Sequence, residues 1–485
     1  MEPHSQFLYS SLEANLQTML SIMHHSSDLV VRELKIGTDK PLSVAVIFIE
    51  GLVDTHEINE RIINTLMFKK TEYATVSFCQ TNGLPDLPIA NIKQIDDFQS
   101  LCSSILSGET VILIEGLNVG LAADTRGVEE RSIEKPTSQT VIRGPQEGFT
   151  EALQTNIALI RKIINSTNLT VIKKVLGNVT KTNVAVLYLS GTADCEVVSE
   201  VFQRLEQIDM DGILEGSYIE EFIQDAKYSL FPTVYNTERP DAAVAGLLEG
   251  RVVIVVDGTP FVLLVPCLFI NFLHASEDYY QRWDFGFTRT MRFISSLYSL
   301  LAPSMYIAIT TFHQEVLPST LLVSLAAQRE GVPFPAFVEA LIMIAAFELM
   351  NEASVRMPRA VGSAISIVGA LVLGQAAVEA GFVSAAMVII VSSTAIANFT
   401  IPSVSAAIPI RLLRYGFMAI AASIGIYGIY IALMAMILHL CSLRSFGIPY
   451  MTPLAPFRKE DWKDSVIRLP FWTQRSQNKT NKVKK

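Results

Sequence analysis

The chain has 485 residues, 50% of them hydrophobic, and its mean hydropathy is +0.36. A soluble protein of this length rarely has so positive an average, so part of the chain is expected to lie in lipid. The formal net charge of -9 argues against a general nucleic-acid binder.

The cysteines and the N-terminal stretch bear on the cellular compartment. The five cysteines are Cys79, Cys102, Cys195, Cys267 and Cys441. No two have the spacing of a metal clamp, and an odd number argues against a full set of disulfides, so a reducing compartment is expected. The N-terminal stretch MEPHSQFLYSSLEANLQTML has no basic region followed by an apolar core. We therefore expect no cleaved signal peptide and a cytoplasmic first half.

Residues 1–245 carry charge throughout and alternate strand-like with helix-like segments. Apolar runs and spacing predict strands at 43–50, 110–115 and 183–189, and helices at 56–67 and 195–207. This alternation predicts an α/β region, built of two small subdomains. The sequence IEGL follows the first two strands and hints at related units.

The stretch 250–266 (GRVVIVVDGTPFVLLVP) has the composition of a membrane span, but Asp257-Gly258 lies at its centre. Asp-Gly between two β-branched runs is a strong hairpin signal. A carboxylate in the middle of a bilayer costs about 2.5 kcal/mol or more. We therefore predict a β-hairpin just outside the membrane.

Two glycines and a proline precede an apolar-periodic run in the stretch RGPQEGFTEALQTNIALIRKII from Arg143. A phosphate-binding loop needs Lys-Ser/Thr after its last glycine, whereas Gly148 is followed by Phe-Thr and flanked by glutamates. The pattern instead predicts a helix with Thr150 as N-cap and Glu151 in its first turn. Its buried stripe would be Leu153, Ile157, Ile160 and Ile164.

The last third of the chain has a different composition. It holds uncharged runs at 293–314, 361–378, 380–410 and 415–442, each about the length of a bilayer crossing or more. The chain therefore divides into a cytoplasmic α/β domain (1–245), a membrane-proximal hairpin and linker (246–290), an all-α helical membrane domain (291–444) and a basic cytoplasmic tail (445–485). A cytoplasmic domain and tail require an even number of crossings, so we predict four, with 334–350 interfacial or re-entrant. A crossing by 334–350 would make five.

Three carboxylates interrupt or closely follow the apolar segment 334–350: Glu339, Glu348 and Glu352. One helical stripe cannot hold all three, because Glu339 lies opposite Glu348 at helical spacing. A carboxylate in a bilayer normally faces an aqueous cavity or a cation, and a ring of them favours cations. The alternative is ion pairing with Arg329, Arg356 or Arg359.

Other residues of this region are candidates for polar or packing roles. Further candidate pore or polar membrane residues are Gln375, Glu379 and Asn398, the last more typical of an interhelical hydrogen bond. Small residues four apart predict close helix packing at Ser366, Ala370 and Gly374, and at Ala421 and Gly425. Arg411 and Arg414 are predicted to mark an interface by snorkelling, Pro303 and Pro402 to kink helices, and His313 to be a satisfied interfacial histidine.

The amino-acid sequences of several long blocks resemble those of the A-subunit family of spore germinant receptors, the GerA type. These blocks are RGPQEGFTEALQTNIALIRK, TERPDAAVAGLLEGRVVIVVDGTPFVLLVP from Thr237, EDYYQRWDFGFTRTMRFIS from Glu277, YIAITTFHQEVLPSTLL from Tyr306, REGVPFPAFVEALIMIAAFELMNEASVRMP from Arg329, GALVLGQAAVEAGFVSAAMVIIV from Gly369 and SFGIPYMTPLAPF from Ser445. The first hundred residues carry little of the resemblance.

The resemblance implies an integral subunit of a nutrient-sensing receptor in the inner membrane of bacterial endospores. It implies a transporter-like B subunit and a lipoprotein C subunit as partners, and an A subunit that oligomerises into an ion channel whose opening releases cations. A non-conducting scaffold that relays the signal is the alternative. A transporter is disfavoured because no repeat of broken helices is visible.

An enzyme is not expected. The sequence holds no HExxH, no GxSxG and no phosphate-binding loop, nor a His–carboxylate cluster at metal-binding spacing. No cofactor or metal is predicted.

Overall fold

The structure, a computed structural model, describes residues 7–36, 41–68, 87–89, 91–127, 135–136, 139–141, 143–279, 286–357 and 374–457. It divides into two compact units. The first comprises Met1–Lys227 and Val234–Cys267, and the second comprises Tyr228–Thr233 and Leu268–Lys485.

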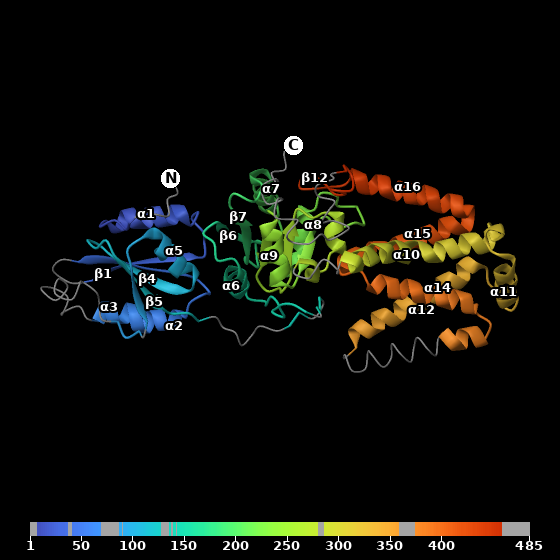
Figure 1. Cartoon of the computed structure of the whole chain (residues 1–485), viewed down its shortest axis with the longest axis horizontal. Coiled ribbons are helices and arrows are strands. Elements are labelled where there is room, and N and C mark those ends of the chain that lie inside the picture. The colour runs from blue at the N-terminus through green and yellow to red at the C-terminus, as the bar shows by residue number, and fades with distance from the viewer. Residues whose placement is uncertain are drawn as a thin grey trace. The chain divides into compact units, whose positions relative to one another are not determined.

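The first unit contains two five-stranded antiparallel sheets, which we call with their helices the first and second modules (Figure 1). The first module holds α1 (Leu12–Ile22), β1 (Leu29–Ile36), β2 (Leu42–Ile49), α2 (Thr55–Glu57), a π-helical turn (Ile58–Ile63), α3 (Asn64–Phe68), β3 (Ile92–Ile95), α5 (Phe98–Leu106), β4 (Glu109–Ile114) and β5 (Gly120–Asp124). The second holds α6 (Leu153–Ile163), β6 (Leu169–Leu176), β7 (Thr182–Leu189), α7 (Cys195–Glu206), α8 (Gly216–Ile223), β8 (Tyr235–Thr237), α9 (Pro240–Leu248), β9 (Val252–Val256) and β10 (Val262–Val265).

Helices cover both faces of the first sheet, which explains its continuous apolar strands. On one face, Ala45, Ile47 and Ile49 of β2 pack into a core with α1 and α5. On the other face, Val44, Val46 and Phe48 pack with the helical segment 55–68. The sequence prediction of strands and helices in this region is confirmed, apart from the π-helical turn.

The two modules have the same topology. The strand order is β1-β2-β4-β5-β3 in the first sheet and β6-β7-β9-β10-β8 in the second. A helix precedes each sheet, helices follow its second strand, and one helix precedes its fourth strand. The first unit is therefore built from two copies of one α-β-β-α-β-α-β-β arrangement. The IEGL sequences do not mark these copies, because both follow strands of the first sheet, β2 and β4.

A buried asparagine makes the same contacts in both modules. Asn15 of α1 accepts a hydrogen bond from the Tyr9 backbone N–H (2.8 Å) and donates to its carbonyl (2.7 Å). Asn156 of α6 does the same with Thr150, also six residues earlier (2.7 and 2.6 Å). Both side chains are fully paired in this way, as buried amides require.

The start of α6 corrects the prediction that Thr150 is its N-cap. The helix begins at Leu153 with Ala152 as N-cap, and Glu151 lies before the first turn. Thr150 is held instead by Asn156, and the Leu153 N–H donates to Asp257 (3.1 Å). In the first module Glu115 accepts from the N–H of Leu12 in the same way (2.8 Å). The predicted apolar stripe of α6 is buried.

The predicted hairpin of 250–266 is present as the antiparallel pair β9–β10. It lies inside the second sheet, where β9 pairs with β7 and β10 with β8. The predicted boundary after residue 245 therefore falls within the first unit, which continues through Cys267. The stretch 250–266 has the composition of a membrane span because both of its strands are fully buried in the sheet and are therefore continuously apolar.

A buried ion pair joins the two modules. Arg161 of α6 donates to Asp28, which precedes β1, from Nε (2.8 Å) and Nη2 (3.1 Å), and both side chains are at most 1% exposed. Ser26 donates to the same carboxylate (2.6 Å) and accepts from the Val171 N–H of β6 (2.9 Å). Lys173 adds a half-exposed pair with Glu50 (2.6 Å).

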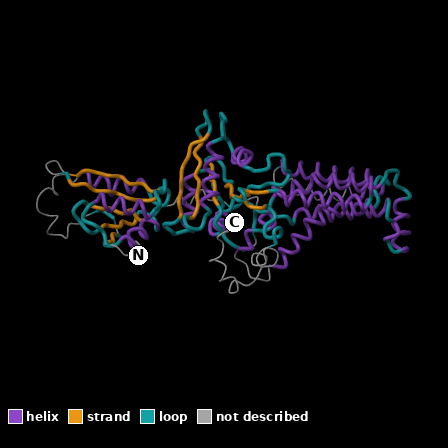
Figure 2. Tube along the Cα trace, turned by 90° about the horizontal axis from the view of Figure 1, so that it is seen from above, coloured by secondary structure: helices purple, strands orange, loops and turns teal. Residues whose placement is uncertain are grey.

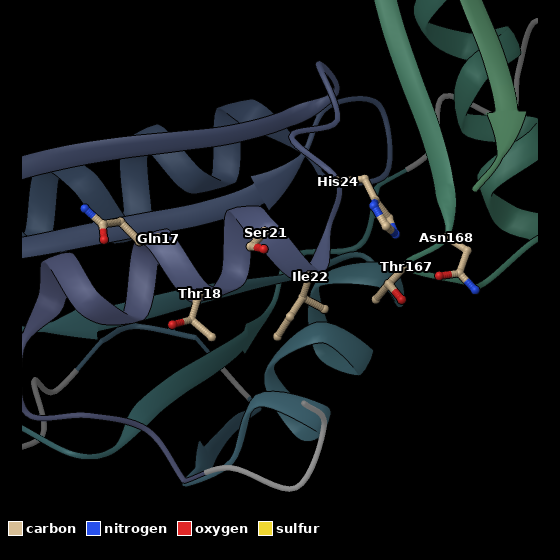
Figure 3. A pocket seen from close by; sticks show the side chains of 7 residues that line it. All are labelled: Gln17, Thr18, Ser21, Ile22, His24, Thr167 and Asn168. Atoms are coloured by element: carbon tan, nitrogen blue, oxygen red, sulfur yellow. The ribbon is translucent and has the colours of Figure 1, made fainter. Parts of the chain in front are cut away.

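A cavity of about 550 Å³ lies beside this junction (Figure 3). Most of its lining residues have polar side chains, and they come from α1, from His24 just after it and from the turn before β6: Gln17, Thr18, Ser21, Ile22, His24, Thr167 and Asn168. No carboxylate, lysine or arginine is among these lining residues.

The second unit is helical. It holds α10 (Gly286–Thr311), α11 (Ser319–Arg329), α12 (Ala336–Arg356), α14 (Ala385–Phe399), α15 (Val404–Ile424) and α16 (Ile426–Ser442). Figure 2 shows helices of this unit lying alongside one another, and α10 contacts α15 more extensively than any other described helix. Among the described residues, α10 and α15 are long and apolar enough to cross a membrane, and α14 and α16 are shorter apolar helices.

Two predicted apolar runs are each divided between helices. The run 380–410 covers α14, a short link containing Pro402, and the start of α15, so Pro402 separates helices rather than kinking one. The run 415–442 breaks at Gly425, whose φ of +71° ends α15 and starts α16. Ala421 and Gly425 are thus not a packing pair on one helix. Most of 361–378 lies outside the described residues.

The chain segments that enter and leave the helical unit are tied together. The Ser445 hydroxyl donates to the Thr233 carbonyl (2.8 Å), and the Phe269 N–H donates to the Tyr450 carbonyl (3.0 Å). Tyr450 is buried and its ring contacts that of Phe269. The start of the predicted basic tail is therefore folded onto the unit, with a short hairpin of Arg444–Ser445 and Ile448–Pro449.

Candidate functional site: buried polar groups of the helical unit

Glu339 of α12 is completely buried and caps another helix. Its Oε1 accepts hydrogen bonds from the backbone N–H and the hydroxyl of Ser384, both at 2.5 Å. Ser384 is the N-cap of α14, so the carboxylate lies at the positive end of that helix dipole. Its Oε2 has no hydrogen-bond partner in the part of the chain that is described, and the Tyr306 side chain lies close to both Glu339 and Ser384.

Glu348 and Glu352 are both ion-paired. Glu348 of α12 accepts from Arg411 of α15 at both carboxylate oxygens, with Nε at 3.0 Å from Oε1. The ion pair agrees with the alternative interpretation, but its partner is Arg411 and not Arg329, Arg356 or Arg359. The interfacial position of Arg411 stays a prediction. Glu352 pairs with Arg356 one turn later at 2.5 Å, as the alternative reading predicted, and both side chains are well exposed.

Arg414 of α15 is 2% exposed, which contradicts the prediction that it snorkels to an interface. Its Nε donates to the Ser299 carbonyl of α10 (2.8 Å) and its Nη2 to the Ser299 hydroxyl (2.6 Å). Ser299 in turn lies 3.5 Å from the Asn398 amide oxygen of α14, a contact that agrees with the interhelical role predicted for Asn398. Three helices meet at this serine.

The remaining candidates are more exposed or lie elsewhere. Gln375 donates to Glu379 at 2.8 Å, and both side chains face outward from this unit. Gly374 is buried beside Val388, where an added methyl group would be 3.6 Å from that side chain. Ser366 and Ala370 lie outside the described residues, so their packing role stays a prediction.

His313 lies against the turn between α15 and α16. An added Cβ on Gly425 would lie 2.7 Å from its Cε1, and its ring packs on Tyr427 with centroids 5.6 Å apart. Its Nδ1 is buried without a hydrogen-bond partner among the described residues. The prediction of a satisfied histidine therefore agrees with the ring packing but not with the hydrogen bonding of Nδ1.

Three ionisable side chains of this unit, two buried and one partly buried, therefore each bridge two helices. Glu339 joins α12 to α14, Glu348 joins α12 to α15, and Arg414 joins α15 to α10. Sequence reasoning found these three charges, because charges in apolar segments are conspicuous. It missed Ser299 and Ser384, since a serine in an apolar helix carries no comparable signal. In the described part of the chain no group of three His, Cys, Asp or Glu is placed to hold a metal.

Comparison with known proteins shows what this architecture belongs to. The chain matches the family described as Bacillus/Clostridium GerA spore germination protein over residues 17–480. It is 49% identical to spore germination protein KA of Bacillus subtilis (strain 168) over 95% of this chain and 85% of that protein. Spore germination protein B1 of the same organism is 38% identical over 95% of each chain, and spore germination protein GerLA of Bacillus cereus is 38% identical over 92% and 90%.

One solved structure is also similar, the crystal structure of the N-terminal domain of the A subunit of the Bacillus megaterium spore germinant receptor GerK3. It is 34% identical, covers 55% of this chain and 98% of its own, and gives a TM-score of 0.41.

An α/β unit followed by an apolar helical unit, with relatives of nearly equal length, places the protein in the class of spore germination proteins. Within that class, the chain belongs to the GerA family. The resemblance stated from the sequence blocks is thereby confirmed.

Proposed function

We propose that the chain is the A subunit of a nutrient-sensing spore germinant receptor, and that it triggers germination by oligomerising into a gated cation channel in the spore inner membrane. The match to the GerA family over residues 17–480 carries the germination role. In this proposal the chain is not an enzyme, and a transporter-like B subunit and a lipoprotein C subunit are its partners.

The helical unit supports a membrane location. Two described helices, α10 and α15, have the length and composition of bilayer crossings. Many large apolar side chains of α14 and α16 are exposed in the single chain, among them Ile389, Ile396, Tyr430 and Leu438. Lipid or neighbouring subunits would cover them, because water would not be a favourable surrounding for so much apolar surface.

The geometry changes which carboxylates are the best candidates for a cation path. Glu339 and Glu348 are committed to Ser384 and Arg411 inside one subunit. Glu352 and Glu379 are exposed, and their only described partners, Arg356 and Gln375, lie one turn away on the same helix, so both carboxylates can face a lumen between copies of the chain. A ring of carboxylates contributed by several subunits would favour cations.

The scaffold function has an observation of its own. The three deeply placed charges Glu339, Glu348 and Arg414 all tie helices together within the chain. Such cross-links would let the unit transmit a change of position without conducting ions.

One experiment separates the two functions. Spores carrying Glu352→Gln together with Glu379→Gln are compared with wild type and with Glu206→Gln, an exposed carboxylate of the first unit. The channel proposal expects nutrient-triggered potassium release to fall several-fold in the double variant at unchanged protein level. Unchanged potassium release in the double variant would remove these carboxylates from the path and favour the scaffold.

A further inference from the structure

The longest helix of the second unit contains a proline that breaks its hydrogen-bond ladder. Pro303 lies inside α10 and is buried. In an α-helix the N–H of residue 303 would bond to the carbonyl of residue 299, and proline has no N–H to give. The carbonyl of Ser299 therefore loses its partner within the helix. Ser299 is 0% exposed, so water does not reach it.

An unpaired buried carbonyl costs roughly as much as a lost hydrogen bond, so a replacement donor is expected. The structure supplies one from a different helix. Arg414 of α15 donates its Nε to the Ser299 carbonyl at 2.8 Å and its Nη2 to the Ser299 hydroxyl at 2.6 Å. The guanidinium thus takes the place of the missing Pro303 N–H, and it donates two hydrogen bonds to Ser299, one to the carbonyl and one to the hydroxyl.

Arg414 is well suited to this position. A guanidinium presents parallel N–H donors in a fixed fork, which matches two acceptors on one residue, whereas a lysine ammonium would act as a single point. The contact joins α10 to α15, the helix that α10 contacts most extensively among the described helices. One turn earlier on α15, Arg411 holds Glu348 of α12, so the two arginines fix α15 to two neighbours.

We propose that Arg414 is a positioning residue for α10: it replaces the hydrogen bond that Pro303 removes, and it thereby fixes the register of α10 against α15. Ser299 is the residue through which it acts, and Asn398 of α14 lies at the edge of the same contact. The proposal holds for a channel and for a scaffold alike, because it concerns how the helices are held.

The test is a double-substitution cycle in the full chain, produced in spores and also extracted in detergent. Arg414→Met removes the donors, and it is expected to lower the melting temperature of the extracted protein and to slow nutrient-triggered potassium release about tenfold. Pro303→Ala restores an N–H four residues after Ser299 and is expected to be close to wild type, since a carbonyl accepts two hydrogen bonds.

The double variant tests whether the Pro303 N–H and the Arg414 guanidinium can replace each other. Arg414→Met with Pro303→Ala is expected to regain most of the melting temperature and most of the release rate, because α10 then satisfies its own carbonyl. Arg414→Lys is expected to fall between wild type and Arg414→Met. A double variant no better than Arg414→Met, or an Arg414→Met protein that behaves as wild type, would overturn the proposal.

The two readouts keep this inference apart from the proposed function. Recovery of the melting temperature reports the helix contact, whether or not the chain conducts ions. Potassium release reports the receptor role. Recovery of melting temperature without recovery of release would support the positioning role and show that Pro303 itself is needed for signalling.

Discussion

Single residues of the first unit show how burial changes chemistry. Glu220 of α8 lies beside Asn236 of β8, and its burial raises the pKa of its carboxyl from 4.5 to about 7. A hydrogen bond from Asn236 opposes this shift, and the charge of Glu215 adds to it. The folded protein therefore binds a proton more tightly at Glu220 than the unfolded chain does.

The sign of the resulting pH dependence follows. Between pH 4.5 and about 7 the unfolded chain ionises Glu220 while the folded protein keeps it neutral, so stability falls as pH rises through this window. Glu220→Gln cannot ionise and is expected to be more stable than wild type at pH 8 and equal to it at pH 4.5. Urea unfolding of residues 1–267 at both values measures this. A stability gain of the same size at both pH values would contradict the assignment.

At the scale of one residue, the sequence predicted positions better than partners. The charges Glu339, Glu348 and Arg414 stood out because they interrupt apolar helices. Their pairing did not, because Ser384 lies 45 residues from Glu339, Arg411 lies 63 from Glu348, and Ser299 lies 115 from Arg414. Contacts at such separations depend on how helices cross, which local spacing does not encode.

Helices α1 and α6 show how an element can depend on a residue far along the chain. The first N–H of each helix donates to a distant carboxylate, Glu115 for α1 and Asp257 for α6, which lie 103 and 104 residues away. The helix α1 has a second cap, Ser11, whereas α6 has no side-chain cap bond of its own. The two helix starts are therefore unequally protected.

Removal of these carboxylates is expected to cost about 1 kcal/mol, and more for Asp257→Ala than for Glu115→Ala. Glu151→Ala is the matched control, because this exposed carboxylate precedes α6 without lying in its first turn. Urea unfolding of residues 1–267 measures all three. Equal losses for Glu151→Ala and Asp257→Ala would mean that general charge, rather than the cap, matters.

Elements were predicted well where their periodicity is local. The predicted strands appear close to their bounds as β2, β4 and β7, and so does the predicted helix 195–207 as α7. Helix ends in the second unit were missed, because an apolar run gives no signal at a break such as Gly425, and its turn is set by a left-handed backbone next to His313. The number of crossings stays a prediction.

At the scale of the whole first unit, the two modules are expected to unfold together because of one buried pair. Asp28→Asn leaves the Arg161 charge without its counterion in a site at most 1% exposed. Breaking such a pair costs about 3–5 kcal/mol. Wild-type residues 1–267 are therefore expected to unfold in one urea transition, and the Asp28→Asn variant in two, because the two modules then unfold independently.

The neighbouring pair Lys162–Glu147 provides the control. It also involves α6, but both side chains are more than 40% exposed. Glu147→Gln is expected to change stability by less than about 1 kcal/mol and to keep a single transition. A single transition at an unchanged midpoint in Asp28→Asn would show that the modules are coupled by apolar contacts instead.

The duplication of the modules could not be recognised from the sequence. The shared contacts rest on backbone groups and on one asparagine and one carboxylate per copy, so few side chains need to match. The sequence predicted two α/β subdomains, which is confirmed, but not that they are alike.

The fastening of Thr233 to Ser445 and of Phe269 to Tyr450 has a mechanical consequence. The polypeptide passes between the two units three times, after Lys227, Thr233 and Cys267. A displacement carried along residues 228–233 is therefore expected to reach the end of α16 directly through the Thr233–Ser445 hydrogen bond, without passing through the intervening helices.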